Sequence, residues 1–119
     1  MRLFLGIDLD ACDELKDYNL KDLVQLEKAI NYIRLKIIQK HLDNGVIFRN
    51  LTNIYIYDSV KIGKGTVIYG DQHIRGNTVI GEDCILEPGN IIENTTLGNE
   101  VKVIKSVLKD CRIDNKTTV

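Results

Sequence analysis

The stretch IGEDCILEPGNIIENTT, residues 80–96, places an aliphatic residue at every sixth position, at Ile80, Leu86 and Ile92. A period of six matches neither the 3.6 residues of a helical turn nor the two-residue alternation of a two-sided strand. It is typical of a short strand followed by a tight turn, repeated along the chain. The stretch therefore predicts repeating strands joined at corners.

The same period extends from Ile56 to Val119, with shortened steps before Leu97 and before Val107. A residue of small or middling size follows most of the aliphatic residues four positions later. The predicted aliphatic positions are Ile56, Ile62, Ile68, Ile74, Ile80, Leu86, Ile92, Leu97, Val103, Val107, Ile113 and Val119. The predicted small positions are Val60, Thr66, Thr78, Cys84, Asn90, Val101, Cys111 and Thr117.

A larger repeat is three of these hexapeptides long. Its units begin at Ile62, Ile80, Leu97 and Ile113, at spacings of 18, 17 and 16 residues. Three strands and three corners return the chain to the same face, so each unit is one triangular coil of a parallel β-helix. We expect Ile80 inside the coils between Ile62 and Leu97, and Thr95 on the surface at a shortened corner.

Residues 19–44 follow a helical period instead. Asn19 is expected to cap the start of this helix, Asp22 to lie against the positive end of its dipole, and Gly45 to end it in a left-handed conformation. The predicted apolar stripe, which packs on the coils or on a neighbouring subunit, is Leu23, Leu26, Ile30, Ile33 and Ile37. The chain thus divides into an N-terminal segment (residues 1–18), an amphipathic helix (residues 19–44) and a β-helix of about three to four coils (residues 46–119).

Composition argues against several classes of function. The 119 residues include 16 Lys and Arg against 17 Asp and Glu, a net charge of −1, which predicts no binding of nucleic acid. Asp8 and Asp10 interrupt the short apolar run at the start, so the sequence predicts no signal peptide, and nothing approaches the ~20 apolar residues of a membrane span. Three cysteines are no disulfide framework, and we expect a cytoplasmic protein.

Several residues imitate functional motifs. Residues 63–66, GKGT, resemble a phosphate-binding loop, but the same place in the next coils lacks the lysine, which favours a corner turn. His41 and His73 are isolated and define neither a general base nor a metal site, although His73 could line a cleft. Cys84 and Cys111 are expected to fill small inner positions. The group Tyr55, Tyr57 and Tyr69 could stack on a ligand or cover the open end of the core.

Ile-Gly or Leu-Gly followed by four residues recurs as IGKGTV (62–67), IGEDCI (80–85) and LGNEVK (97–102). This repeat resembles the left-handed β-helix of hexapeptide-repeat acyltransferases. Within that group, VQLEKAINYIRLKIIQKHLDNGV (24–46) is similar to the linker helix of the bifunctional N-acetylglucosamine-1-phosphate uridyltransferases/glucosamine-1-phosphate acetyltransferases. Residues 76–119 are similar to the first coils that follow that helix. The resemblance covers about residues 18–119, and residues 1–17 fit it poorly.

The resemblance implies where catalytic residues would lie. In that family the uridyltransferase site lies in a domain before the linker helix, and the acetyltransferase site lies in later coils, beyond the position of Val119. No residue of this chain occupies a catalytic position of the family, so we predict no catalytic, cofactor-binding or metal-binding residue and no cofactor. The family also implies a homotrimer.

Three functions remain. The first is a non-catalytic, trimeric assembly module that binds a protein partner at its C-terminal coil and binds neither nucleic acid nor membrane. The second is an acyltransferase that uses acetyl-CoA on an amino sugar phosphate at subunit interfaces. The third is a fragment of a UDP-N-acetylglucosamine pyrophosphorylase that other chains complete.

Overall fold

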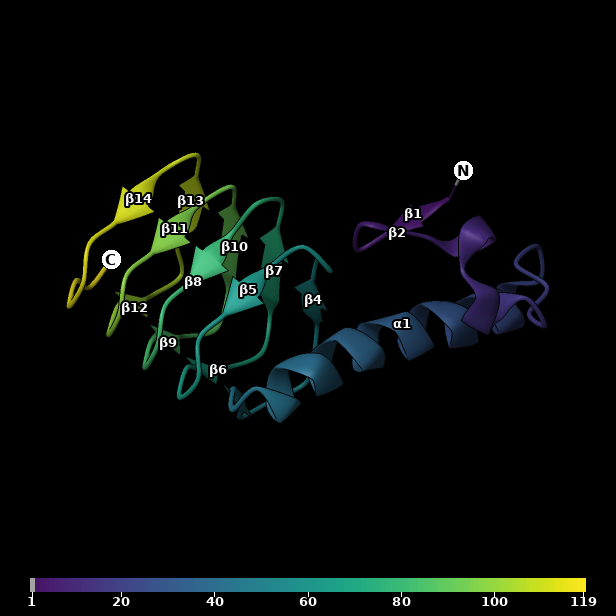
Figure 1. The fold of residues 1–119 in the computed structure, drawn as a ribbon, viewed down its shortest axis with the longest axis horizontal. Coiled ribbons are helices and arrows are strands. Elements are labelled where there is room, and N and C mark those ends of the chain that lie inside the picture. Colours follow the sequence, from purple (N-terminus) through teal and green to yellow (C-terminus); the bar gives the residue numbers. More distant parts are fainter. Residues whose placement is uncertain (1) are drawn as a thin grey trace.

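The computed structural model describes residues 2–119, and most of them form a triangular β-helix with one long helix at its first coil (Figure 1). Its three parallel sheets have the strand orders β4-β7-β10-β13, β5-β8-β11-β14 and β3-β6-β9-β12. The strands are β3 (Ile47–Phe48), β4 (Ile54–Ile56), β5 (Lys61–Ile62), β6 (Val67–Ile68), β7 (Gln72–Arg75), β8 (Val79–Ile80), β9 (Ile85–Leu86), β10 (Asn90–Glu93), β11 (Thr96–Leu97), β12 (Lys102–Val103), β13 (Val107–Lys109) and β14 (Arg112–Ile113). Successive strands belong to different sheets, which confirms the predicted coils.

The inner aliphatic residues stack from coil to coil as the period predicts. Ile62, Ile80 and Leu97 are direct partners in the β5, β8 and β11 ladder, and all three are buried. Residues directly before them point outward, because successive side chains of a strand lie on opposite faces. The prediction that Ile80 is enclosed by Ile62 and Leu97 is confirmed.

The predicted register is wrong at one strand. Leu108, not Val107, points inward on β13, where it pairs with Ile92 while Val107 pairs with Ile91. Ile113 lies ten positions after Val103, and the inward Leu108 divides this interval into steps of five and five, whereas the sequence suggested four and six. Val107 is consequently one of the most exposed aliphatic residues of the coils.

Thr95 is also placed wrongly by the sequence pattern. Its side chain is buried rather than on the surface, and its Oγ1 donates a hydrogen bond to the Glu93 carbonyl at 2.9 Å. Thr78 occupies the equivalent corner one coil earlier and is likewise buried. The corner residues thus form an inner column of their own, and the shortened corner after β10 does not turn Thr95 outward.

The helix α1 (Leu23–Asp43) begins four residues later than predicted. Asp22 is its N-cap, since the Asp22 carboxylate accepts a hydrogen bond from the Gln25 amide, whereas the Asn19 side chain accepts one from the Lys21 amide. Gly45 follows the C-terminal end with a φ of +87°, in the left-handed conformation that was predicted.

Only the C-terminal half of α1 lies over the coils, where it contacts β4 (Figure 1). Leu23, the first residue of the predicted stripe, is therefore 76% exposed. Leu26 and Ile30 are partly buried. The fully buried residues of the helix are Ala29, Ile33, Ile37, Ile38 and His41.

The N-terminal segment folds along the same helix. It forms a hairpin of β1 (Leu3–Phe4) and β2 (Ile7–Asp8), followed by the short 3-10 helices η1 (Leu9–Ala11) and η2 (Asp13–Leu15). Leu5, Leu9 and Leu15 are buried. The Glu14 carboxylate accepts hydrogen bonds from Tyr32 and Lys36 of α1, and the Lys36 ammonium lowers the pKa of that carboxyl. Across residues 2–119, α1 and the shorter helices fall short of the length and apolar character that a membrane crossing requires.

Candidate functional surfaces

The outer face of the β3-β6-β9-β12 sheet carries an aliphatic column over its first three strands, and an ion pair between Lys102 and Glu87 at 3.9 Å lies at β12. Ile47, Val67 and Ile85 form one outward column along three neighbouring coils, and Lys102 continues it. Ile47 is 38% exposed and Ile85 is 36% exposed. A flat sheet face with a continuous aliphatic column can pack against another flat apolar surface.

The outer face of the β4-β7-β10-β13 sheet carries polar contacts between coils. The rings of Tyr55 and His73 stack, with their centroids 5.2 Å apart and their planes at 18°. The Glu93 carboxylate lies between the Arg75 guanidinium at 3.9 Å and the Lys109 ammonium at 3.4 Å. These titratable side chains bridge successive coils, and exposed pairs of this kind contribute ~0–1 kcal/mol each.

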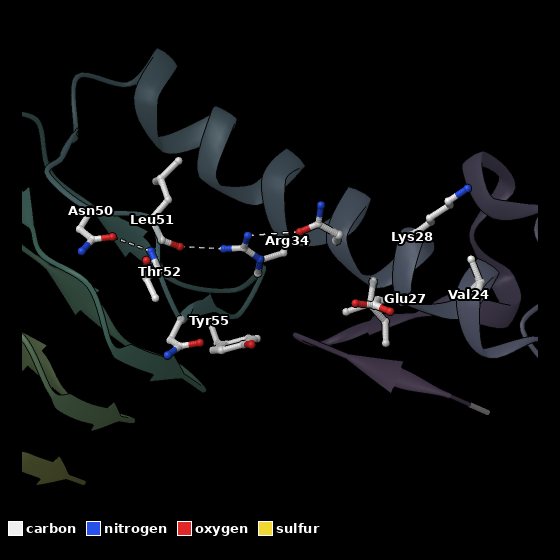
Figure 2. A pocket seen from close by; sticks show the side chains of 11 residues that line it. Val24, Glu27, Lys28, Arg34, Asn50, Leu51, Thr52 and Tyr55 are labelled. Carbon is white, nitrogen blue, oxygen red and sulfur yellow. Dashed lines mark hydrogen bonds between the residues drawn. The ribbon is translucent and has the colours of Figure 1, made fainter.

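A groove of about 820 Å³ lies between α1 and the loop before β4 (Figure 2). Arg34 crosses it, with Nη1 donating to the Leu51 carbonyl and Nη2 donating to Asn31 Oδ1, both at 3.2 Å. At the coil side, Asn50 Oδ1 accepts a hydrogen bond from the Thr52 amide at 2.8 Å. Arg34 thus joins the helix to the first coil, while Asn31 bonds within the helix and Asn50 bonds within the loop.

Residues 63–66, which resemble a phosphate-binding loop in sequence, lie at a corner of the coils. A Cβ on Gly63 would lie 2.6 Å from the Gly81 backbone of the next coil, and a Cβ on Gly65 would lie 2.1 Å from Asp83 Oδ1. Gly65 also has a φ of +77°. The close backbone stacking of corners requires glycine at position 63, and the left-handed φ favours glycine at position 65, so the motif has a structural explanation.

The two histidines lie in different environments. His73 is exposed and stacks on Tyr55, whereas His41 is only 2% exposed at the junction of α1 and the coils. Among the described residues, neither ring nitrogen of His41 has a hydrogen-bond partner. Burial lowers the pKa of His41 to about 4, the Lys40 ammonium acts in the same direction, and Asp58 opposes both.

Two of the three cysteines, Cys84 and Cys111, occupy the small positions that the repeat predicts. Cys84 is buried, its Sγ donates to the Gly98 carbonyl at 3.2 Å, and burial raises the pKa of its thiol. Cys111 is partly buried and its Sγ lies 3.6 Å from Thr95 Oγ1. A buried thiol with a raised pKa is a poor nucleophile, so Cys84 has a packing role.

Three or more His, Cys, Asp or Glu side chains do not converge on any point within residues 2–119 where they could hold a metal ion. The polar residues that sequence reasoning missed include Arg34, Lys40 and the buried Gln72, whose Nε2 donates to the Glu87 carbonyl at 2.7 Å. Lys40 Nζ donates to the Asp58 carbonyl at 3.1 Å. The helical period alone does not separate Arg34 and Lys40 from the solvated Lys28, because their partners, the Leu51 carbonyl and the carbonyl and carboxylate of Asp58, are distant in the sequence.

Comparison with known proteins identifies relatives of this chain. No family model matches it. It is 39% identical over 100 residues to the bifunctional protein GlmU of Geobacillus sp. (strain WCH70), which is 84% of this chain and 22% of that protein. The identity to the bifunctional protein GlmU of Alkaliphilus oremlandii is 35% over 111 residues, 93% of this chain and 24% of that protein. For the bifunctional protein GlmU of Brevibacillus brevis it is 32% over 113 residues, 95% of this chain and 24% of that protein.

Stacked triangular coils of hexapeptide repeats define the chain as a hexapeptide-repeat protein with a left-handed β-helix. Within that class, it is related to a segment of the bifunctional protein GlmU, as the linker helix and first coils indicated. The chain spans about a quarter of the length of these relatives, 22–24%. The alignment with the Brevibacillus brevis protein covers 113 of the 119 residues, so the similarity extends into residues 1–17, which had shown little resemblance.

Proposed function

We propose that the chain is an assembly module that forms a homotrimer through the flat faces of its coils and does not itself catalyse a reaction. The observation that carries this proposal is the outward column of Ile47, Val67 and Ile85 on one sheet face. Three such faces meeting at a threefold axis would bury this column, and closed cyclic symmetry limits the assembly to a fixed size.

A non-catalytic role is supported by how the polar side chains are used. His73 stacks on Tyr55, Glu93 bridges Arg75 and Lys109, and the Cys84 thiol is buried with a raised pKa. Each of these groups makes a contact that holds neighbouring coils together. We expect no transfer of acetyl to glucosamine-1-phosphate and no transfer of uridylyl to N-acetylglucosamine-1-phosphate by the purified chain. Turnover that His73→Ala abolishes would favour the acyltransferase instead.

Light scattering over a dilution series tests the trimer. We expect a single species of about 40 kDa, three times the 13.5 kDa chain. Ile85→Glu should shift the mass toward the monomer, because it places a charge in the apolar column. Val79→Glu is the matched control, since Val79 is similarly exposed but lies on the neighbouring β8 face. A mass near 13.5 kDa at every concentration would contradict the proposal.

The relationship to GlmU favours one other candidate. The alignments cover 84–95% of this chain but only 22–24% of the relatives, as expected of a portion of a sugar-nucleotide enzyme that other chains complete. The intact mass of the native protein and of its complexes, isolated from the cell, separates the two candidates. A protein partner at the coil of β12, β13 and β14 and a cytoplasmic location stay predictions from the sequence.

A further inference from the structure

Within residues 2–119 the β-helix has a first and a last coil, and both present strand edges. Among residues 2–119, β4 and β13 are the outer strands of one sheet, and β5 and β14 are the outer strands of the next. Inside the molecule, coils of the same shape pair with one another in register, as β4 does with β7 and β10 with β13. An uncovered first coil therefore offers an edge that the last coil of a second copy can extend.

The first coil is covered by residues 2–44, here called the N-terminal unit, which comprises the hairpin, the 3-10 helices and α1. The Leu5 carbonyl accepts a hydrogen bond from the Asp58 amide at 2.8 Å. Arg34 donates to the Leu51 carbonyl at 3.2 Å, and Lys40 donates to the Asp58 carbonyl at 3.1 Å. Figure 2 shows Arg34 reaching from the helix to Leu51. The unit thus occupies backbone groups on both sides of β4.

The N-terminal unit also closes the apolar interior at this end. Ile54 and Ile56 of β4 are fully buried, and α1 packs on this strand. Ile33 and Ile37 of α1 belong to the same apolar cluster. Without this cover the inner aliphatic residues of the first coil would be exposed to water. They would form an apolar surface suited to contact with a second copy.

We infer that the N-terminal unit is an end cap, which prevents the last coil of a second copy of this chain from adding to the first coil. A coil-to-coil contact of this kind joins the two different ends of the molecule. Such a head-to-tail contact does not close, so repeated addition would produce a filament along the prism axis. The inference is independent of the proposed trimer, because lateral packing through the β3-β6-β9 face gives a fixed mass and leaves both ends unchanged.

Two variants open the cap to different extents. Arg34→Ala with Lys40→Ala removes two side-chain donors to first-coil carbonyls. Ile33→Asp with Ile37→Asp places carboxylates in the buried stripe of α1 and displaces the helix. The matched control is Lys21→Ala with Lys28→Ala, which removes the same charge from two exposed lysines of the N-terminal unit. Far-UV circular dichroism tests whether the coils remain folded in each variant, and we expect the strand signal of the unmodified chain.

We expect the mass of at least one opened variant to grow with time and concentration, at least tenfold above the mass of the control. The filaments should show a repeat of about 4.7–4.8 Å along their axis, the spacing of hydrogen-bonded strands. The control should keep the mass of the unmodified chain. A constant mass in both opened variants overturns the inference.

A substitution on the last coil separates filament growth from non-specific aggregation. The Ser106 carbonyl accepts a hydrogen bond from the Ile91 amide at 3.0 Å, so alternation directs the Val107 N–H to the edge of β13 that no strand within residues 2–119 pairs with. Val107 is the first residue of β13, where proline is tolerated. Val107→Pro, added to an opened variant, should stop the growth. Growth that continues unchanged would show that the assembly does not use this edge and would also overturn the inference.

Discussion

The coils of residues 46–119 and the N-terminal unit of residues 2–44 bury apolar side chains in different ways. In the coils each inner residue lies between its own equivalents, as Ile80 lies between Ile62 and Leu97. In the N-terminal unit Leu5 and Leu9 are buried by contacts that occur once and have no equivalent elsewhere. The coils therefore resemble a repeat protein, in which stability is a sum of similar neighbour contacts, whereas the N-terminal unit depends on a few particular ones.

The largest expected effect tests the inner column of the coils. Ile80→Ala should lower the free energy of unfolding by on the order of 2–5 kcal/mol, because the substitution removes buried methyl groups and leaves a cavity between two coils. Denaturant titration measures this loss. Val79→Ala is the control, since Val79 precedes Ile80 on β8 but points outward. Equal losses in the two variants would contradict the assigned register.

The next effect tests the junction between the two regions through His41. In the folded chain His41 has a pKa of about 4, and in the unfolded chain its pKa returns to about 6.5. The unfolded state therefore binds a proton first as the pH falls. The stability due to neutral, buried His41 is complete above pH 6.5 and is lost between pH 6.5 and pH 4.

Lowering the pH from 7 to 5 should therefore cost the unmodified chain on the order of 2 kcal/mol more than it costs His41→Leu. Leucine keeps the apolar packing of this site and does not titrate. The measurement is a pair of denaturant titrations at each pH. An identical pH dependence of the two chains would mean that His41 is solvated and that α1 does not seal the junction.

A smaller effect is expected at the corners. Thr95→Ala removes a buried hydroxyl that bonds to the Glu93 carbonyl, and should cost about 1–2 kcal/mol. Thr118→Ala makes the same chemical change at an exposed position and should cost under about 0.5 kcal/mol. Thermal unfolding of the two variants side by side measures the difference. A loss of stability at Thr95 as small as that at Thr118 would indicate that the Thr95 side chain lies on the surface, as the sequence suggested.

The two regions also differ in how far their structure could be predicted. The coils were predictable because residues six positions apart occupy equivalent places on successive sides of a coil, so the period indicates which side chains point inward. There were two exceptions. Thr95 is buried at a shortened corner, and at Val107 two five-residue steps replace the six-residue period, so only the pairing of Leu108 with Ile92 settles the register. In the N-terminal unit the helix was predictable from its period, but its start at Leu23 was not. Asn19 and Asp22 both accept a hydrogen bond from a backbone N–H, and only the donor to Asp22, Gln25, belongs to α1.

The candidate surfaces were less predictable than the fold. The hydrogen bonds of Arg34 and Lys40 end on the carbonyls of Leu51 and Asp58, and a backbone carbonyl leaves no signature in the sequence. The hairpin that brings Leu5 to Asp58 joins residues more than 50 positions apart. Contacts that depend on a single long-range approach require the folded coordinates, whereas repeated contacts are visible in the period itself.

The smallest expected effect is at the far end of α1. Leu23 has the right helical phase for the apolar stripe, yet it is 76% exposed because the N-terminal half of the helix extends beyond the coils. Leu23→Ala should change the free energy of unfolding by less than about 0.5 kcal/mol, since little apolar area is lost and alanine is at least as favourable in a helix. Ile33→Ala on the same helix is the control and should cost several kcal/mol, on the order of 2–5. Denaturant titrations at two protein concentrations decide the outcome. If Leu23→Ala costs as much as Ile33→Ala and the cost grows with protein concentration, the prediction is wrong. Leu23 would then be buried at an interface between copies formed by the N-terminal half of α1.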